Sequence, residues 1–335
     1  MTRLRCFGLA AALFCLLPHA TSWSQTPDLG ADRACLEGFL DTGADSLTLG
    51  EMRARCQGSV ANPDDAEETP LGDRLSAERE AAARPFSILA HKPNYILAAA
   101  WNQRGWDDAE FQQVDPDYVN EDVEIQFQFS FKVPLAIDLF DGRMDLFAAY
   151  TNRSFWQAYN SANSEPFRET NHEPELWAQF RNDWEIWGLT NRVNQVGFVH
   201  QSNGRNDPVS RSWNRFYANF LFEKDGFVLS LKPWLWIYQD KEKSDNPDID
   251  EFMGHGEIRA AWERNGHVLS GMMRNQIESG FEHGALEASW SFPVFNYPYL
   301  KGYVQYFYGY GESLIDYDRR VNRIGVGISV TDWLD

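Results

Sequence analysis

Residues 123 to 133 read Val123-Glu-Ile-Gln-Phe-Gln-Phe-Ser-Phe-Lys-Val133, so apolar and polar side chains alternate without a break. In an extended strand this alternation places every apolar side chain on the same face. The stretch matches the roughly 9–11 residues that a tilted strand needs to cross a bilayer. In a soluble sandwich the apolar face would be a core, whereas in a membrane β-barrel it would face lipid. The neighbouring segments favour the barrel.

The same two-residue period recurs after residue 85 in segments of similar length with aromatic ends. The predicted strands are 95–101, 123–133, 144–154, 173–181, 185–200, 213–222, 227–238, 254–262, 268–275, 285–292, 300–310 and 322–330. They number about twelve, an even number as in single-chain bacterial barrels. The aromatic content of 15% suits the two interfacial girdles of such a barrel. The sequence therefore predicts an all-β fold, a transmembrane antiparallel up-and-down β-barrel.

The N-terminal residues differ from the rest of the chain. Arg3 and Arg5 precede an apolar run over residues 6–17, and small residues follow. This is typical of a secretory signal peptide, which we assign to residues 1–22. Residues 23–85 are rich in Ala, Asp, Glu and Arg, with a short polar helix expected at 75–84. We expect residues 23–85 to form a short N-terminal periplasmic segment, followed by a barrel domain over 86–335.

Two of the four cysteines remain after removal of the signal peptide, namely Cys35 and Cys56. An even pair in an exported chain favours a disulfide that closes a small N-terminal loop. A metal site is the weaker alternative, because two thiols without nearby His or Cys partners rarely suffice.

The formal net charge of −19 argues against a nucleic-acid partner, which would require a basic surface. It is compatible with acidic surface loops that repel one another unless a divalent cation is present. Simple solubility is the alternative explanation, and charge alone does not choose between the two.

Three polar residues, in or directly after two predicted strands, are candidates for a catalytic site. His200 and Ser202 are two apart at a strand end, so they project from one face, where the imidazole could take the hydroxyl proton. Val196 and Phe198 share that face, which is therefore the apolar, lipid-facing side. On the next strand Asn214 is in phase with apolar residues. His200, Ser202 and Asn214 can thus converge on the outer wall of the barrel, near one membrane interface.

A hydrolase acting on lipids would use such a group, with Ser202 as nucleophile, His200 as base and then acid, and Asn214 orienting the imidazole. The alternative is that His200 is a girdle or loop residue and Asn214 a strand-boundary residue. Ser202 lies in no Gly-x-Ser-x-Gly motif, so an α/β-hydrolase is not supported.

The segments around these residues resemble the outer membrane phospholipase A family. The resemblance rests on His200-Gln-Ser-Asn-Gly-Arg205 and Ser210-Arg-Ser-Trp-Asn-Arg215. It extends to Pro166-Phe-Arg-Glu-Thr-Asn171, Glu173-Pro174, Asp245-Asn-Pro-Asp-Ile249 and Gly309-Tyr-Gly-Glu-Ser-Leu-Ile-Asp-Tyr317. Together these motifs cover most of residues 86 to 333.

The resemblance implies a twelve-stranded barrel that hydrolyses acyl esters of phospholipids and lysophospholipids, with A1 and A2 activity, in the bacterial outer membrane. It assigns the catalytic triad to His200, Ser202 and Asn214, and the oxyanion N–H to Gly204. It also implies a Ca²⁺ cofactor, whose hard oxygen ligands fall on the Arg205 carbonyl and the Ser210 hydroxyl.

In the same family a carbonyl of the other subunit completes the calcium site, and this carbonyl matches Ser164. Asp207 and Asp245 match acidic positions linked to calcium, although Asp207 could equally be a turn residue before a proline.

The resemblance further implies an active homodimer. Asn152 matches a polar residue of the lipid-facing dimer seam, where an amide surrounded by hydrocarbon seeks a partner. The rival hypotheses are a passive pore or adhesion barrel with a structural polar cluster, and an inactive relative of the enzymes.

Overall fold

The computed structural model describes residues 69–237, 244–275, 279–280, 282–295 and 297–335. The predicted signal peptide and the predicted Cys35–Cys56 disulfide lie outside the described residues. Among the helices of these described ranges, none is long and apolar enough to cross a membrane.

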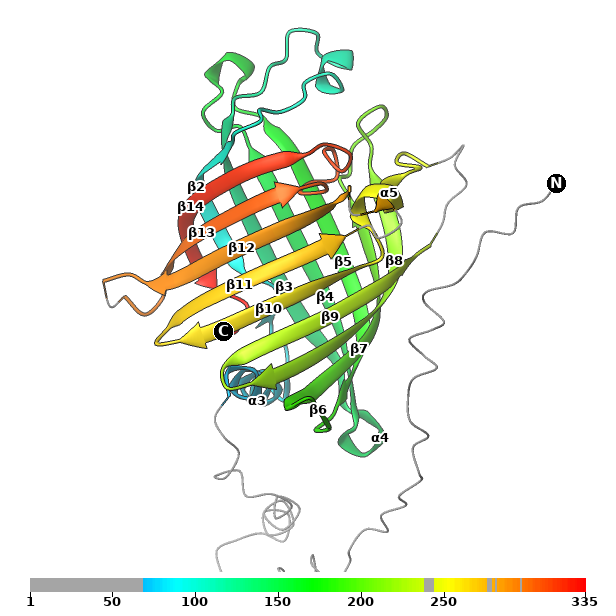
Figure 1. Cartoon of the computed structure of the whole chain (residues 1–335), viewed down its shortest axis with the longest axis vertical. Coiled ribbons are helices and arrows are strands. Elements are labelled where there is room, and N and C mark those ends of the chain that lie inside the picture. The colour runs from blue at the N-terminus through cyan, green and yellow to red at the C-terminus, as the bar shows by residue number, and fades with distance from the viewer. Residues whose placement is uncertain (1–68, 238–243, 276–278, 281, 296) are drawn as a thin grey trace, which may run out of the picture. The chain divides into compact units, whose positions relative to one another are not determined.

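The described strands form one antiparallel sheet that closes on itself (Figure 1). Two of its fourteen strands, β1 (Leu89–Ala90) and β6 (Glu185–Ile186), have two residues each. The twelve long strands are β2 (Asn94–Asn102), β3 (Val123–Asp138), β4 (Met144–Trp156), β5 (Phe167–Arg181), β7 (Leu189–Ser202), β8 (Ser212–Lys224), β9 (Phe227–Trp236), β10 (Gly256–Arg264), β11 (His267–Asn275), β12 (Gly284–Pro293), β13 (Lys301–Gly309) and β14 (Val321–Thr331). Pairing of β14 with β2 closes the barrel, which leaves no free edge. The predicted barrel and its strand number are confirmed.

Side chains of β3 show how the alternating pattern gives the barrel a polar interior and an apolar outside. Glu124 and Gln126 are fully buried in the interior, whereas Phe129 and Phe131 are exposed on the outer wall. Many charged interior groups are paired, as in the 2.8 Å contact between Lys92 Nζ and Glu175 Oε1, because an unpaired buried charge is costly. The polar residues of the alternating pattern therefore face the lumen.

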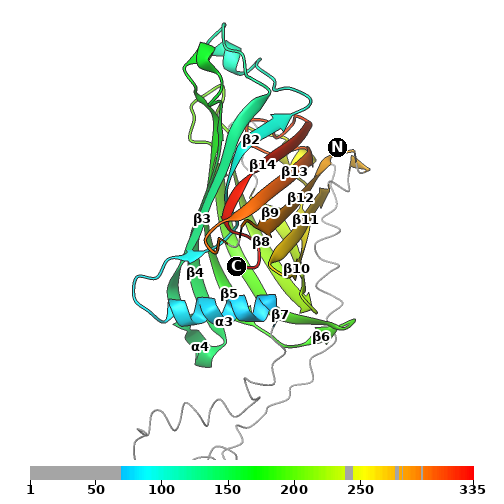
Figure 2. The ribbon, with the colours of Figure 1, turned by 90° about the vertical axis from the view of Figure 1, so that its left-hand side faces the viewer.

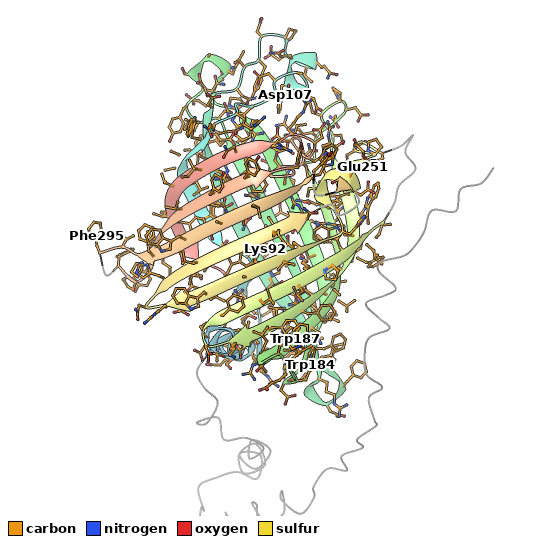
Figure 3. All side chains as sticks on the ribbon, viewed as in Figure 1. Lys92, Asp107, Trp184, Trp187, Glu251 and Phe295 are labelled. Carbon is orange, nitrogen blue, oxygen red and sulfur yellow. The ribbon has the colours of Figure 1, made fainter. Side chains whose placement is uncertain are left out.

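Aromatic residues mark the end of the barrel opposite the candidate site. Figure 3 shows Trp184 and Trp187 at one end and Asp107 at the other. Trp187 is almost fully exposed, as suits an aromatic ring at a membrane interface.

The backbone at Trp187 explains one difference from the predicted strands. Trp187 and Gly188 have positive φ and form a tight turn, so the predicted strand 185–200 is divided into β6 and β7.

Helix α3 (Pro70–Ala82) lies across one end of the barrel (Figure 2). Thr69 begins it, because its side chain accepts a hydrogen bond from the N–H of Gly72 and Pro70 follows it. The helix is therefore longer at its N-terminal end than the predicted 75–84.

Contacts tie α3 to the barrel interior. Glu78 Oε2 lies 2.7 Å from Lys132 Nζ, and Leu71 packs with Val228 and Leu334 in one buried cluster. The compact unit accordingly runs from Glu68 to Asp335 and includes α3, which precedes the domain boundary that the sequence suggested at residue 86.

Candidate active site

Strands β7 and β8 bring the three predicted residues to one end of the barrel. His200 is directly opposite Asn214, and Ser202 is opposite Ser212. Val196 and Phe216, in phase with them, are 57% and 55% exposed on the outer wall. The residues of alternate phase, such as Val199 and Trp213, are buried inside. His200, Ser202 and Asn214 therefore lie on the lipid-facing surface.

The His200 imidazole is oriented by the Asn214 amide. His200 Nδ1 lies 2.8 Å from Asn214 Oδ1. An amide oxygen only accepts hydrogen bonds, so it fixes the tautomer with hydrogen on Nδ1. The lone pair of neutral imidazole is then on Nε2, where it is available to accept a proton.

Ser202 is the last residue of β7 and is half-buried. Its position two residues after His200 places both side chains on the same face. Within the described residues the Ser202 hydroxyl has no hydrogen-bond partner. It is thus free to interact with the imidazole and with a substrate.

The loop after Ser202 is held by the buried side chain of Asn203. Its Oδ1 accepts hydrogen bonds from the N–H groups of Arg205, at 3.3 Å, and Arg211, at 3.0 Å. Its Nδ2 donates to the carbonyl of Val209 at 2.8 Å. Gly204 is exposed and has φ +65°, a conformation that a residue with a side chain rarely adopts. The loop therefore fixes the Gly204 backbone beside Ser202.

A second set of contacts joins this loop to other segments at the same end of the barrel. Arg205 Nη2 donates to the carbonyl oxygens of Phe167 and Arg168, each at 2.8 Å. Arg211 Nη2 contacts both carboxylate oxygens of Glu110 at 2.6 Å. Burial raises the pKa of Glu110, although the charge of Arg211 opposes this shift.

Two of the predicted calcium residues meet in the structure. Ser210 Oγ donates to Asp245 Oδ2 at 2.6 Å. Asp207 is exposed in the same loop, before Pro208. Ser164 is in another loop, the exposed one between β4 and β5, with φ 60°. In the described part of the chain no cluster of three or more His, Cys, Asp or Glu side chains could hold a metal.

Asn152 lies on the outer face of β4, opposite Phe129 on β3 and His172 on β5. Its Oδ1 accepts a hydrogen bond from Ser154 Oγ at 2.9 Å. Within the described residues its amide nitrogen has no partner. A donor group is thus available on the lipid-facing wall.

The chain is similar to known enzymes over most of its length. The family model described as Phospholipase A1 matches residues 71–330. The chain belongs to the phospholipase A1 family. Phospholipase A1 of Klebsiella pneumoniae is 36% identical over 255 residues, covering 74% of this chain and 84% of that protein. Phospholipase A1 of Escherichia coli is 35% identical over 254 residues, covering 74% and 83%.

Solved structures agree with this assignment to the phospholipase A1 family. Outer membrane phospholipase A from Escherichia coli has a TM-score of 0.69 and 34% identity, covering 74% of this chain and all of that one. The Salmonella typhi outer membrane phospholipase, a dimer with bound calcium, has a TM-score of 0.70 and 34% identity, covering 76% and 96%. Membership makes this chain an ester hydrolase by class.

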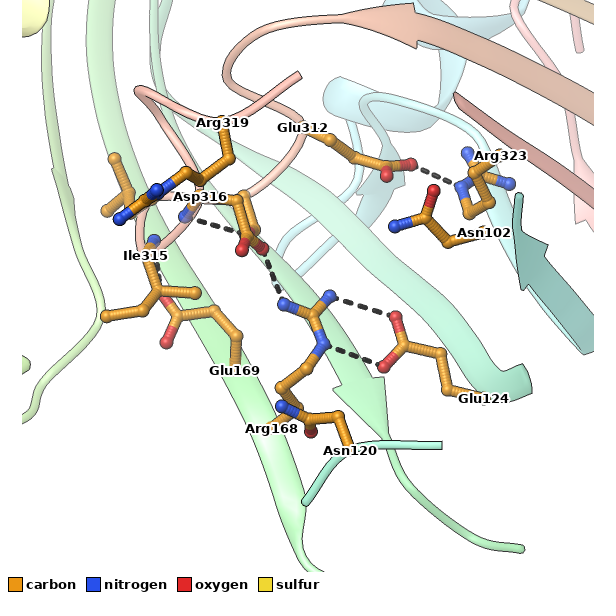
Figure 4. Close-up of polar contacts among 12 residues, drawn as sticks. Asn102, Asn120, Glu124, Arg168, Glu169, Glu312, Ile315, Asp316, Arg319 and Arg323 are labelled. Carbon is orange, nitrogen blue, oxygen red and sulfur yellow. Dashed lines mark hydrogen bonds and ion pairs between the residues drawn. The ribbon is translucent and has the colours of Figure 1, made fainter. Parts of the chain in front are cut away.

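Sequence reasoning missed two features of this phospholipase A1 family site. The first is His172, which register places directly opposite Ser202. The two-residue period of β5 could have placed His172 on the outer face with Pro174 and Leu176. The second is the buried ion cluster of Arg168, Glu124 and Asp316 (Figure 4). Its members are far apart in sequence, so no local pattern marked it.

Proposed function

We propose that this protein is a calcium-dependent phospholipase of the bacterial outer membrane that acts through Ser202, His200 and Asn214. The observation that carries the proposal is the His200–Asn214 hydrogen bond beside Ser202 on the lipid-facing wall. A substrate in the membrane could reach this wall directly. The substrates are phospholipids and lysophospholipids, cleaved at acyl esters with A1 and A2 activity.

In this mechanism His200 Nε2 accepts the Ser202 hydroxyl proton while Oγ attacks the ester carbonyl carbon. The imidazolium then gives this proton to the leaving alcohol, which leaves an acyl-Ser202. A water molecule then attacks the acyl-Ser202 while His200 Nε2 takes its proton. The imidazolium returns this proton to Ser202 Oγ as the fatty acid leaves. Asn214 keeps the imidazole in the required tautomer, although a neutral amide stabilises the imidazolium less than a carboxylate would. The Gly204 N–H donates to the tetrahedral oxyanion.

The residues near Ser202 fit a Ca²⁺ ion. Ser210 Oγ and Asp245 Oδ2 are 2.6 Å apart, and hydroxyl, carboxylate and carbonyl oxygens are the ligands this cation prefers. The proposed ligands are the Ser210 hydroxyl and the Arg205 carbonyl, with Asp207 and Asp245 nearby and the Ser164 carbonyl from a second copy. When bound, calcium would supply positive charge that favours the oxyanion.

Chelation of calcium is expected to lower fatty-acid release from phospholipid in mixed micelles by about a hundredfold, the usual cost of losing an oxyanion-stabilising group. Asp245→Asn should raise the calcium concentration needed for half-maximal rate. Asp183→Asn, in the loop before Trp184 at the opposite end of the barrel, should leave that concentration unchanged. Full activity of wild type in chelator would contradict the calcium assignment.

A second copy of the chain would complete the site through Ser164, so the active form is a homodimer. The outward amide of Asn152 is the seam residue in this proposal, because a donor in hydrocarbon gains most by pairing across an interface. We expect analytical ultracentrifugation in detergent to show a shift to dimer when calcium and a substrate analogue are added. Asn152→Ala should weaken the shift to dimer. If the wild-type protein shows no such shift, calcium- or substrate-driven dimerisation is excluded.

The rival pore or adhesion hypothesis makes a different prediction in the same preparations. It expects conductance or ligand binding without ester hydrolysis. Folded wild-type protein that conducts ions but releases no fatty acid at any calcium concentration would favour it.

A further inference from the structure

A second histidine borders Ser202 on the outer wall. His172 of β5 is the register partner of Ser202 of β7, and directly opposed residues have Cβ atoms about 4.5–5.5 Å apart. His172 is in phase with Leu176, which is exposed, and out of phase with Glu175, which is buried. Its imidazole therefore lies on the same face as the Ser202 hydroxyl, on the side away from β8 and Asn214.

The imidazole of His172 is held in a defined orientation. Its Nδ1 lies 2.6 Å from the Tyr150 hydroxyl, and the two rings are stacked at an angle of 28°. The opposite ring edge faces Gly204. A Cβ atom added to Gly204 would lie 3.7 Å from Cδ2 and 3.8 Å from Nε2 of His172. His172 Nε2 is thus directed towards the backbone that borders the nucleophile.

The Tyr150 contact favours one tautomer of His172. A phenol hydroxyl can donate or accept, and in the arrangement that we adopt the Tyr150 O–H donates to Nδ1, so that the hydrogen of the neutral ring is on Nε2. A nitrogen that holds its hydrogen cannot accept the Ser202 proton, but it can donate. Within the described residues this Nε2–H has no partner.

We propose that His172 Nε2–H donates a hydrogen bond to the oxyanion formed on attack by Ser202, beside the N–H of Gly204. This inference rests on the proposed function. It makes His172 a catalytic residue and Tyr150 a positioning residue that sets its tautomer. A donor fixed beside the reacting carbonyl needs no rearrangement when negative charge develops, which is why such donors stabilise transition states strongly.

Steady-state hydrolysis of one phospholipid in mixed micelles at saturating calcium tests the assignment. His172→Ala should lower kcat on the order of a hundredfold while the apparent KM changes less than about threefold, because the bond forms mainly in the transition state. His172→Gln, which keeps a donor, should recover part of the loss. Tyr150→Phe should lower kcat by about tenfold or less, through a mixed tautomer.

The matched control is His267→Ala. His267 is another outward histidine, whose Nδ1 accepts from the Trp290 Nε1–H at 3.3 Å, and it lies on β11. This variant should keep the wild-type kcat. Circular dichroism would verify that each variant forms the barrel.

Three outcomes would overturn the proposal. Wild-type kinetics in His172→Ala would show that no oxyanion donor is lost. A raised KM with unchanged kcat would mean that His172 binds substrate in its ground state. A loss as large as that of Ser202→Ala would make His172 the general base. If Ser202→Ala itself hydrolyses normally, the proposed function fails as well; if Ser202→Ala is inactive and His172→Ala is not, the His172 inference alone fails.

Discussion

Ser202→Ala is expected to lower the rate of fatty-acid release by about 10⁴-fold or more. Loss of a nucleophile removes the covalent route entirely, and serine hydrolases that lose it retain only the contribution of binding and oxyanion stabilisation. The barrel should fold normally, because the Ser202 hydroxyl has no hydrogen-bond partner within the described residues. Fatty-acid release from mixed micelles at saturating calcium measures the effect.

Ser212→Ala is the control variant, because it removes a neighbouring serine hydroxyl without removing the proposed nucleophile. Ser212 is the β8 residue directly opposite Ser202, and it is in phase with Asn214, so it offers a second half-buried serine hydroxyl on the same wall. Its removal should change the rate by less than a few-fold. Robust hydrolysis by Ser202→Ala would move the nucleophile elsewhere and remove the basis for the triad.

The barrel could be predicted from the sequence because each strand carries its own signal. A period of two with an apolar face, as in β3, needs no knowledge of distant residues. The ends of the strands were harder to predict from the sequence. The separation of β6 from β7 depends on left-handed backbone at Trp187 and Gly188, and Trp187 gives no local sign of it. The extent of α3 depends on a cap at Thr69 and on contacts with barrel residues such as Lys132.

In the candidate site, too, some residues could be placed from the sequence and others could not. Phase along β7 and β8 was sufficient to place His200, Ser202 and Asn214 on one face, and the register then brought His200 opposite Asn214. The period of β5 is enough to place His172 on the outer face, but its position directly opposite Ser202 depends on the register between β5 and β7, which the sequence does not give. The Asn203 side chain organises the loop after Ser202 through hydrogen bonds to backbone groups, which leave no pattern in the sequence.

Arg168→Met is expected to destabilise the barrel by about 3–5 kcal/mol, the usual cost of breaking a buried ion pair from one side. Arg168 is fully buried, with Nε and Nη2 each 2.9 Å from a carboxylate oxygen of Glu124 and Nη1 2.5 Å from Asp316 Oδ2. Its guanidinium also lies 3.6 Å from the Trp106 ring centre. Equilibrium urea unfolding in phospholipid vesicles measures the loss.

A second substitution shows whether Arg168→Met loses stability through the unpaired Glu124 carboxylate or through altered packing. Because Arg168→Met leaves the Glu124 carboxylate buried without its cationic partner, adding Glu124→Gln should restore part of the free energy of unfolding. Arg84→Met removes the exposed pair with Glu80 and should change stability by less than about 0.5 kcal/mol. If Arg168→Met were no more destabilising than Arg84→Met, the buried cluster would not hold this end of the barrel together. The conformation of the loop after Ser202 would then depend on the Asn203 hydrogen bonds and on the contact between Arg211 and Glu110. In that case Arg168→Met should hydrolyse phospholipid at the wild-type rate.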